Sequence, residues 1–186
     1  MGVELKVEQI LDELLEAAKW RRASIPYSEN EGMEQMVVFV GPEGEIASQS
    51  LTWNDEREKY AKMRAVSEIA KKTLTVAIVM ISDTRFTKSD KFGEYFHLPP
   101  ISEIGFEQWQ KEYKTILNGI YGGLIKNLPR ELWTEAVLTV IKGPQIPCQS
   151  RMAAYSEGPN DSIQFIETED MKSDGTKFNL LPDWWV

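Results

Sequence analysis

The chain has 186 residues, 29 of them acidic and 21 basic, so its formal charge at pH 7 is −8. This charge argues against a broad binding surface for nucleic acid or for an anionic membrane. Cys148 is the only cysteine, which excludes an intramolecular disulfide, and no apolar run is long enough to span a bilayer. We expect a single domain over residues 1–186 that resides in the cytoplasm and binds no membrane.

The first half of the chain predicts five elements in the order helix, strand, strand, helix, strand. Apolar residues at three- and four-residue spacing indicate the helices, and β-rich runs indicate the strands. The segment from Gly41 to Gly44, between two such runs, is typical of a hairpin turn. The last strand is apolar throughout, so we expect it to lie centrally in the sheet, covered on each side. These elements span residues 7–22, 36–40, 46–53, 55–72 and 73–81.

The second half adds one helix and an antiparallel meander. A long polar connection precedes a helix with a wide apolar stripe, and three β-rich runs separated by turn residues follow. The aromatic end, Trp184-Trp185-Val186, is expected to dock on the domain. The connection spans residues 82–100, the helix 106–124 and the strands 135–143, 149–157 and 162–169. The sequence thus predicts an α+β fold with a mixed or antiparallel sheet in α-β-β-α-β-α-β-β-β order, and helices packed mainly on one face.

Histidine and cysteine chemistry is restricted, because His97 is the only histidine and Cys148 the only cysteine. A single histidine excludes His-rich zinc sites, and no Gly-x-Ser-x-Gly nucleophile elbow is present for a Ser-His-Asp triad. We expect His97 to be a loop histidine and Cys148 a packed or half-exposed thiol between two strands. No cofactor is predicted, and a non-enzymatic protein is favoured over an enzyme.

Acidic residues just after the third strand offer one catalytic alternative. Asp83, Asp90 and Glu94 could supply oxygen ligands to Mg²⁺ in a metal-dependent hydrolase or nuclease. Their spacing matches no established ligand loop, and polar loops are normally rich in such residues. The metal site is therefore kept only as the alternative to a binding function.

Aromatic residues gather around the same point of the sequence. They belong either to the core beneath a long loop or to a protein-binding surface, because Trp, Tyr and Arg dominate interface hot spots. The aromatic residues concerned are Trp53, Phe86, Phe92, Tyr95, Phe96 and Trp109. The candidate binding surface is formed by Trp53, Asp83, Arg85, Phe86, Tyr95 and His97.

Two segments carry a resemblance to a known group of proteins. Ser82-Asp83-Thr84-Arg85-Phe86 resembles the Ser-Glu-Ala-Trp end of the third strand in short uncharacterised phage and bacterial proteins, with Asp for Glu, Phe for Trp and one residue more. Pro129-Arg130 leading to the strand from Glu135 resembles their Pro-x-Arg-x-Glu stretch. The resemblance implies the same fold order, an insertion over about 90–128 with an extra helix, and a phage or mobile-element origin. It implies no activity.

We therefore predict a non-enzymatic interaction protein that binds a partner protein, forms a homo-oligomer, or both. If the resemblance holds, it is encoded by a phage or mobile element and modulates a host protein. The acidic composition makes nucleic acid the less favoured partner.

Overall fold

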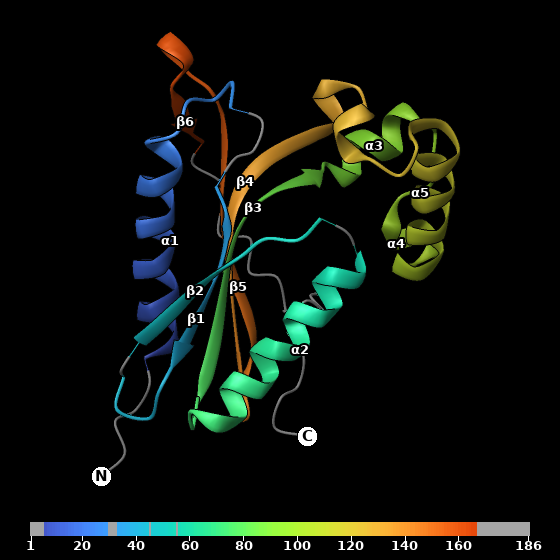
Figure 1. Ribbon diagram of the computed structural model, residues 1–186. Helices are drawn as coiled ribbons and strands as arrows, with labels where there is room; N and C mark the ends of the chain where they lie inside the picture. Colours follow the sequence, from blue (N-terminus) through green and yellow to red (C-terminus); the bar gives the residue numbers. More distant parts are fainter. Residues whose placement is uncertain (1–5, 30–32, 45, 55, 167–186) are drawn as a thin grey trace. The chain divides into compact units, whose positions relative to one another are not determined.

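The computed structural model describes residues 6–29, 33–44, 46–54 and 56–166 and shows an α+β fold (Figure 1). Six strands form one sheet in the order β2-β1-β3-β4-β5-β6. The predicted fold class is confirmed, and the order of the strands along the chain broadly matches the prediction. In the described residues no helix is both long and apolar enough to cross a membrane.

The elements follow the predicted order, with two extra helices, α3 and α4, after the third strand. They are α1 (Val7–Ala23), β1 (Gln35–Val40), β2 (Ile46–Leu51), α2 (Glu56–Lys72), β3 (Ala77–Thr87), α3 (Ser89–Tyr95), α4 (Ile101–Ile104), α5 (Phe106–Tyr121), β4 (Trp133–Gly143), β5 (Ile146–Glu157) and β6 (Ile163–Phe165). Short 3-10 turns lie at η1 (Ile125–Asn127), η2 (Arg130–Leu132) and η3 (Pro159–Asp161). The predicted docking of the tryptophan tail lies outside the described residues.

The C-terminal ends of β3 and α5 differ from the prediction. β3 continues to Thr87, so the Ser82–Phe86 segment is the second half of a strand and not the loop that follows it. α5 ends at Tyr121 because Gly122 takes the left-handed conformation, with φ 63°, and the N–H of the following Gly123 donates to Leu117 O at 3.0 Å. The glycine-rich end of the predicted helix is thus a helix stop.

The described chain divides into two compact units. Residues 84–136, which we call the inserted unit, form one, and the remaining described residues, which we call the sheet unit, form the other. β3 and β4 contribute residues to both units. The predicted insertion, 90–128, falls within the inserted unit, and a single folding domain stays a prediction.

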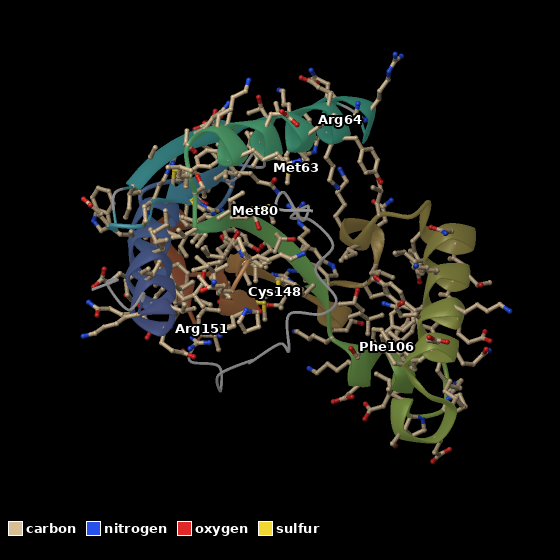
Figure 2. All side chains as sticks on the ribbon, turned by 90° about the horizontal axis from the view of Figure 1, so that it is seen from below. Met63, Arg64, Met80, Phe106, Cys148 and Arg151 are labelled. Atoms are coloured by element: carbon tan, nitrogen blue, oxygen red, sulfur yellow. The ribbon has the colours of Figure 1, made fainter. Side chains whose placement is uncertain are left out.

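In the sheet unit, helices cover both faces of the sheet. β1 pairs antiparallel with β2 and with β3, and Val38 lies opposite Val79. Val38 and Val79 share a core cluster with Leu11 of α1, whereas Met80 points to the other face, toward Met63 of α2 (Figure 2). The prediction that helices pack mainly on one face is therefore corrected. β3 is buried at every position from Ala77 to Ser82, and a strand buried on both sides needs a cover on each.

The inserted unit has an aromatic core of its own. Phe92 of α3 is fully buried, and its ring centroid lies 5.9 Å from that of Trp109 and 4.9 Å from that of Tyr113. The rings of Trp109 and Tyr113 stack at 5.5 Å. This packing arises from the apolar stripe of α5. Phe92 and Trp109, two of the aromatics that the sequence singled out, thus pack in the core.

Candidate binding site: a cationic cluster around Glu135

The six residues of the predicted binding surface fall in different units. Trp53 and Asp83 belong to the sheet unit, and Arg85, Phe86, Tyr95 and His97 to the inserted unit. Trp53 is half-buried and receives the Lys59 ammonium over its ring, at 5.6 Å from the centroid. Phe86 is half-buried in β3, and Tyr95 is half exposed at the end of α3.

Asp83 takes part in a buried network of the sheet unit. Its Oδ2 lies 2.8 Å from Nε of Arg22 and accepts from the Met33 N–H at 3.2 Å, while Oδ1 accepts from the Tyr155 hydroxyl at 2.5 Å. The Arg22 and Asp83 side chains are only 3% and 11% exposed. Burial raises the pKa of Tyr155 above its usual value of 10.0, and the hydrogen bond to Asp83 raises it further. The carboxylate therefore ties α1, β3 and β5 together.

The metal alternative gains no support from these carboxylates. Both oxygens of Asp83 are already bonded to protein donors, while Asp90 and Glu94 lie exposed on α3. In the described part of the chain, no three His, Cys, Asp or Glu side chains gather as metal ligands would.

His97 lines a hollow of about 680 Å³ in the inserted unit. The histidine is exposed and has a positive φ of 54°. Asp90, Glu94 and Glu103 lie around the same hollow, with the side chain of Trp109 also in its wall. Two of the three proposed metal ligands are thus brought together with His97, but the third, Asp83, belongs to the other unit.

A cluster of positive side chains lies where β3, α3, η2 and β4 meet within the inserted unit. Lys88 N donates to Leu132 O at 2.8 Å, which fixes the start of α3 beside η2. We use the name cationic cluster for Arg85, Lys88, Lys91 and Arg130 together with the carboxylate of Glu135.

Glu135 and Trp133 hold the two arginines of this cluster in place. Nη2 of Arg85 lies 3.3 Å from Oε1 of Glu135, and Nη2 of Arg130 lies 3.7 Å from Oε2. The Arg130 guanidinium also lies 4.1 Å from the Trp133 ring centroid and donates from Nη1 to Trp133 O at 2.9 Å. Both arginines remain accessible, with side chains 37% and 48% exposed. Their planar groups are therefore pre-oriented and reachable from solvent.

Lys88 carries a positive charge among other positive charges. Burial lowers the pKa of its ammonium below the usual 10.5, and the charges of Lys91 and Arg130 lower it further. Among the residues that the structure describes, no carboxylate forms an ion pair with it. Within the same described region, Nε of Arg85 is buried and has no hydrogen-bond acceptor. Oε2 of Glu135 is likewise buried and accepts no hydrogen bond among the described residues, so the Arg85–Glu135 pair keeps one unsatisfied donor and one unsatisfied acceptor.

No protein-family model, curated protein or solved structure matches the chain. The resemblance to short phage and bacterial proteins accordingly stays a prediction.

Of the cationic cluster, the sequence predicted only Arg85 as a binding residue. The net charge concealed the others, because residues 84–136 contain seven basic and seven acidic residues and the rest of the chain carries the whole charge of −8. One local signal was present. Arg85, Lys88 and Lys91 recur at three-residue spacing, but Arg130 and Glu135 join them only through the fold.

Proposed function

We propose that this chain is a non-enzymatic interaction protein whose cationic cluster binds an acidic segment of a partner protein. The observation that carries the proposal is a cluster of four cations in which Arg85 and Arg130 share the carboxylate of Glu135, while Lys88 lies beside Lys91 and Arg130. The one-cysteine sequence supports a cytoplasmic site of action. A phage or mobile-element origin, with a host protein as partner, is supported by the sequence resemblance alone.

The chemistry of the cluster favours carboxylates. Arginine binds carboxylates with two parallel hydrogen bonds, and Arg85 and Arg130 are already oriented by Glu135 and Trp133, which lowers the entropy lost on binding. An incoming anion would also relieve the repulsion among Lys88, Lys91 and Arg130. A short acidic segment suits this site better than nucleic acid, because a long polyanion would meet the negative charge of the remaining chain.

Fluorescence anisotropy with a labelled 20-residue peptide of aspartate, glutamate and serine tests this function. We expect the wild-type chain to bind the peptide, and the double variant Lys88→Glu, Lys91→Glu to bind it about tenfold more weakly or worse, a loss of roughly 1.4 kcal/mol. The matched control is Lys111→Glu, Lys114→Glu, which makes the same charge change at the same spacing on exposed positions of α5. We expect this control to stay within about threefold of wild type, since charges outside the site act only weakly at physiological salt.

Two results would overturn the proposal. One is an equal loss of affinity in both double variants, which would mean that only net charge matters. The other is the absence of any binding by the wild-type chain to the acidic peptide. Circular dichroism of each variant confirms that the fold is retained.

A further inference from the structure

β2 forms one edge of the sheet and is open to solvent. It pairs with β1 through all six of its residues, from Ile46 opposite Val40 to Leu51 opposite Gln35. On its other side no strand is present among the described residues. The first five residues of β2 are exposed on both faces of the sheet, and Ile46 is 60% exposed. A row of backbone donors and acceptors therefore remains available for pairing.

This edge lacks the devices by which proteins usually prevent strand pairing. Edge strands are normally protected by charged side chains, proline, bulges or very short length. The β2 sequence, Ile-Ala-Ser-Gln-Ser-Leu, has no charge and no proline, although 27% of the whole chain is charged. The opposite edge, β6, has only three residues. β2 is thus the edge that is long enough and uncharged enough to accept another strand.

We infer that β2 pairs antiparallel with β2 of a second copy of this chain. The unpaired backbone groups of an edge require an extended strand as their partner. A second copy fits because each copy offers one such edge, and an isologous pair satisfies both edges at once. The absence of charge is decisive, since two copies that each carry −8 approach each other with least repulsion along an uncharged strand. This association is independent of the cationic cluster.

The two-fold symmetry also predicts a register. In an antiparallel pair, residues directly opposite each other point to the same face of the sheet. When the two strands are identical, the residue numbers of an opposed pair therefore differ by zero or by an even number. Centring the pair on the exposed stretch places Ser48 opposite Ser48 of the second copy and Ile46 opposite Ser50. The contact is small, so we expect a dimer that dissociates upon dilution.

Light scattering after size-exclusion chromatography, run over a range of concentrations, tests the association. We expect the wild-type mass to rise from 21.3 kDa toward twice that value as concentration increases. Ser48→Lys should remain a monomer throughout, because it places two ammonium groups at the symmetry axis. Ser102→Lys, the same change at an exposed position of α4, should behave like wild type. The inference is overturned if the wild-type chain is a monomer at every concentration, which would also be the result if a segment of its own chain covered β2. It is overturned as well if Ser48→Lys forms a dimer.

Cross-linking tests the register. In a Cys148→Ser background, Ser48→Cys should form an intermolecular disulfide upon treatment with diamide, because opposed Cα atoms in an antiparallel pair are close enough for an S–S bond. Ile46→Cys should cross-link much less, because its opposite residue is Ser50. Equal cross-linking by the two variants would contradict pairing about Ser48.

Discussion

Asp83, which the sequence places in the candidate binding surface, forms a buried ion pair with Arg22. It follows the apolar half of β3, and its carboxylate accepts from Arg22, Tyr155 and the Met33 N–H. The partners lie in α1 and β5 and in the segment that leads into β1. At the sequence level an acidic residue after a buried strand is typical of a site. In the fold the same carboxylate is the counter-charge of a buried arginine.

We predict that Asp83→Asn lowers the free energy of unfolding by about 3 kcal/mol, because it leaves the buried charge of Arg22 without its partner. Urea denaturation followed by circular dichroism measures the change. Asp90→Asn, at an exposed position of α3, should remain within about 0.5 kcal/mol of wild type. A divalent metal ion that raises the melting temperature of wild type but not of Asp83→Asn would contradict this structural role.

We predict that the ammonium group of Lys88 lowers the stability of the folded chain while it adds positive charge to the cationic cluster. Its pKa is lowered in the folded chain, so the unfolded chain binds the proton more tightly. The resulting loss of folding stability is complete at pH values below the pKa of Lys88 in the folded chain. It disappears as the pH rises from that pKa to 10.5, because Lys88 is then neutral in both the folded and the unfolded chain. Lys88→Met should therefore raise Tm at pH 7 by about 1 to 2 °C, and this gain should vanish above pH 10.5. Differential scanning calorimetry across this pH range checks the prediction, and a lower Tm at pH 7 would refute it.

At the scale of elements, β3 extends further in the fold than its local sequence pattern predicts. The strand was predicted to end at Ile81 because Ser82-Asp83-Thr84-Arg85 has the composition of a loop. It continues because these polar side chains have partners: Asp83 has Arg22, Arg85 has Glu135, and Thr87 Oγ1 lies 2.8 Å from the Tyr113 hydroxyl. A strand can carry polar residues when the neighbouring elements satisfy them. Such partners, 50 or more residues away in the Asp83 and Arg85 pairs, give no signal in the strand's own sequence.

Two glycines in different elements should respond oppositely to alanine. At Gly143, the last residue of β4, an added Cβ would overlap the backbone oxygen of Val76, whereas at Gly119 in α5 it would meet nothing within 4 Å. Gly143→Ala should therefore reduce stability by about 1–3 kcal/mol. Gly119→Ala should increase it by about 0.5–1 kcal/mol, because alanine favours the helix. Urea midpoints of the two variants, compared with wild type, test the pair, and a change of the same sign in both would contradict it.

At the scale of the whole molecule, charge is unevenly distributed along the chain. The inserted unit is neutral and contains the cationic cluster, while the remaining residues carry −8. The two proposed interactions should therefore respond to salt in opposite directions. The attraction of an acidic segment to the cluster is screened by salt, and so is the repulsion between two acidic copies.

Between 50 and 300 mM NaCl, we expect affinity for the acidic peptide to fall by about tenfold or more and self-association through β2 to stay constant or strengthen. Anisotropy and light scattering on the same preparation measure the two quantities. Ser48→Lys serves as the control that removes only the second. A parallel loss of both with salt would mean that self-association also depends on the cationic cluster.

The sequence by itself determined the α+β class, the order of the elements, the hairpin at Gly41 to Gly44 and the central position of β3. These features follow from the spacing of apolar residues, from turn residues and from uninterrupted apolar runs. Each of these patterns can be recognised within a short segment of the sequence. Only the tertiary structure decided that α1 and α2 cover opposite faces, that Asp83 pairs with Arg22, and that Arg130 and Glu135 join Arg85. The ion pair between Arg85 and Glu135 joins residues 50 positions apart and exists only after the chain has folded. The attraction between opposite charges depends on their distance in the fold, so it produces no regular spacing in the sequence.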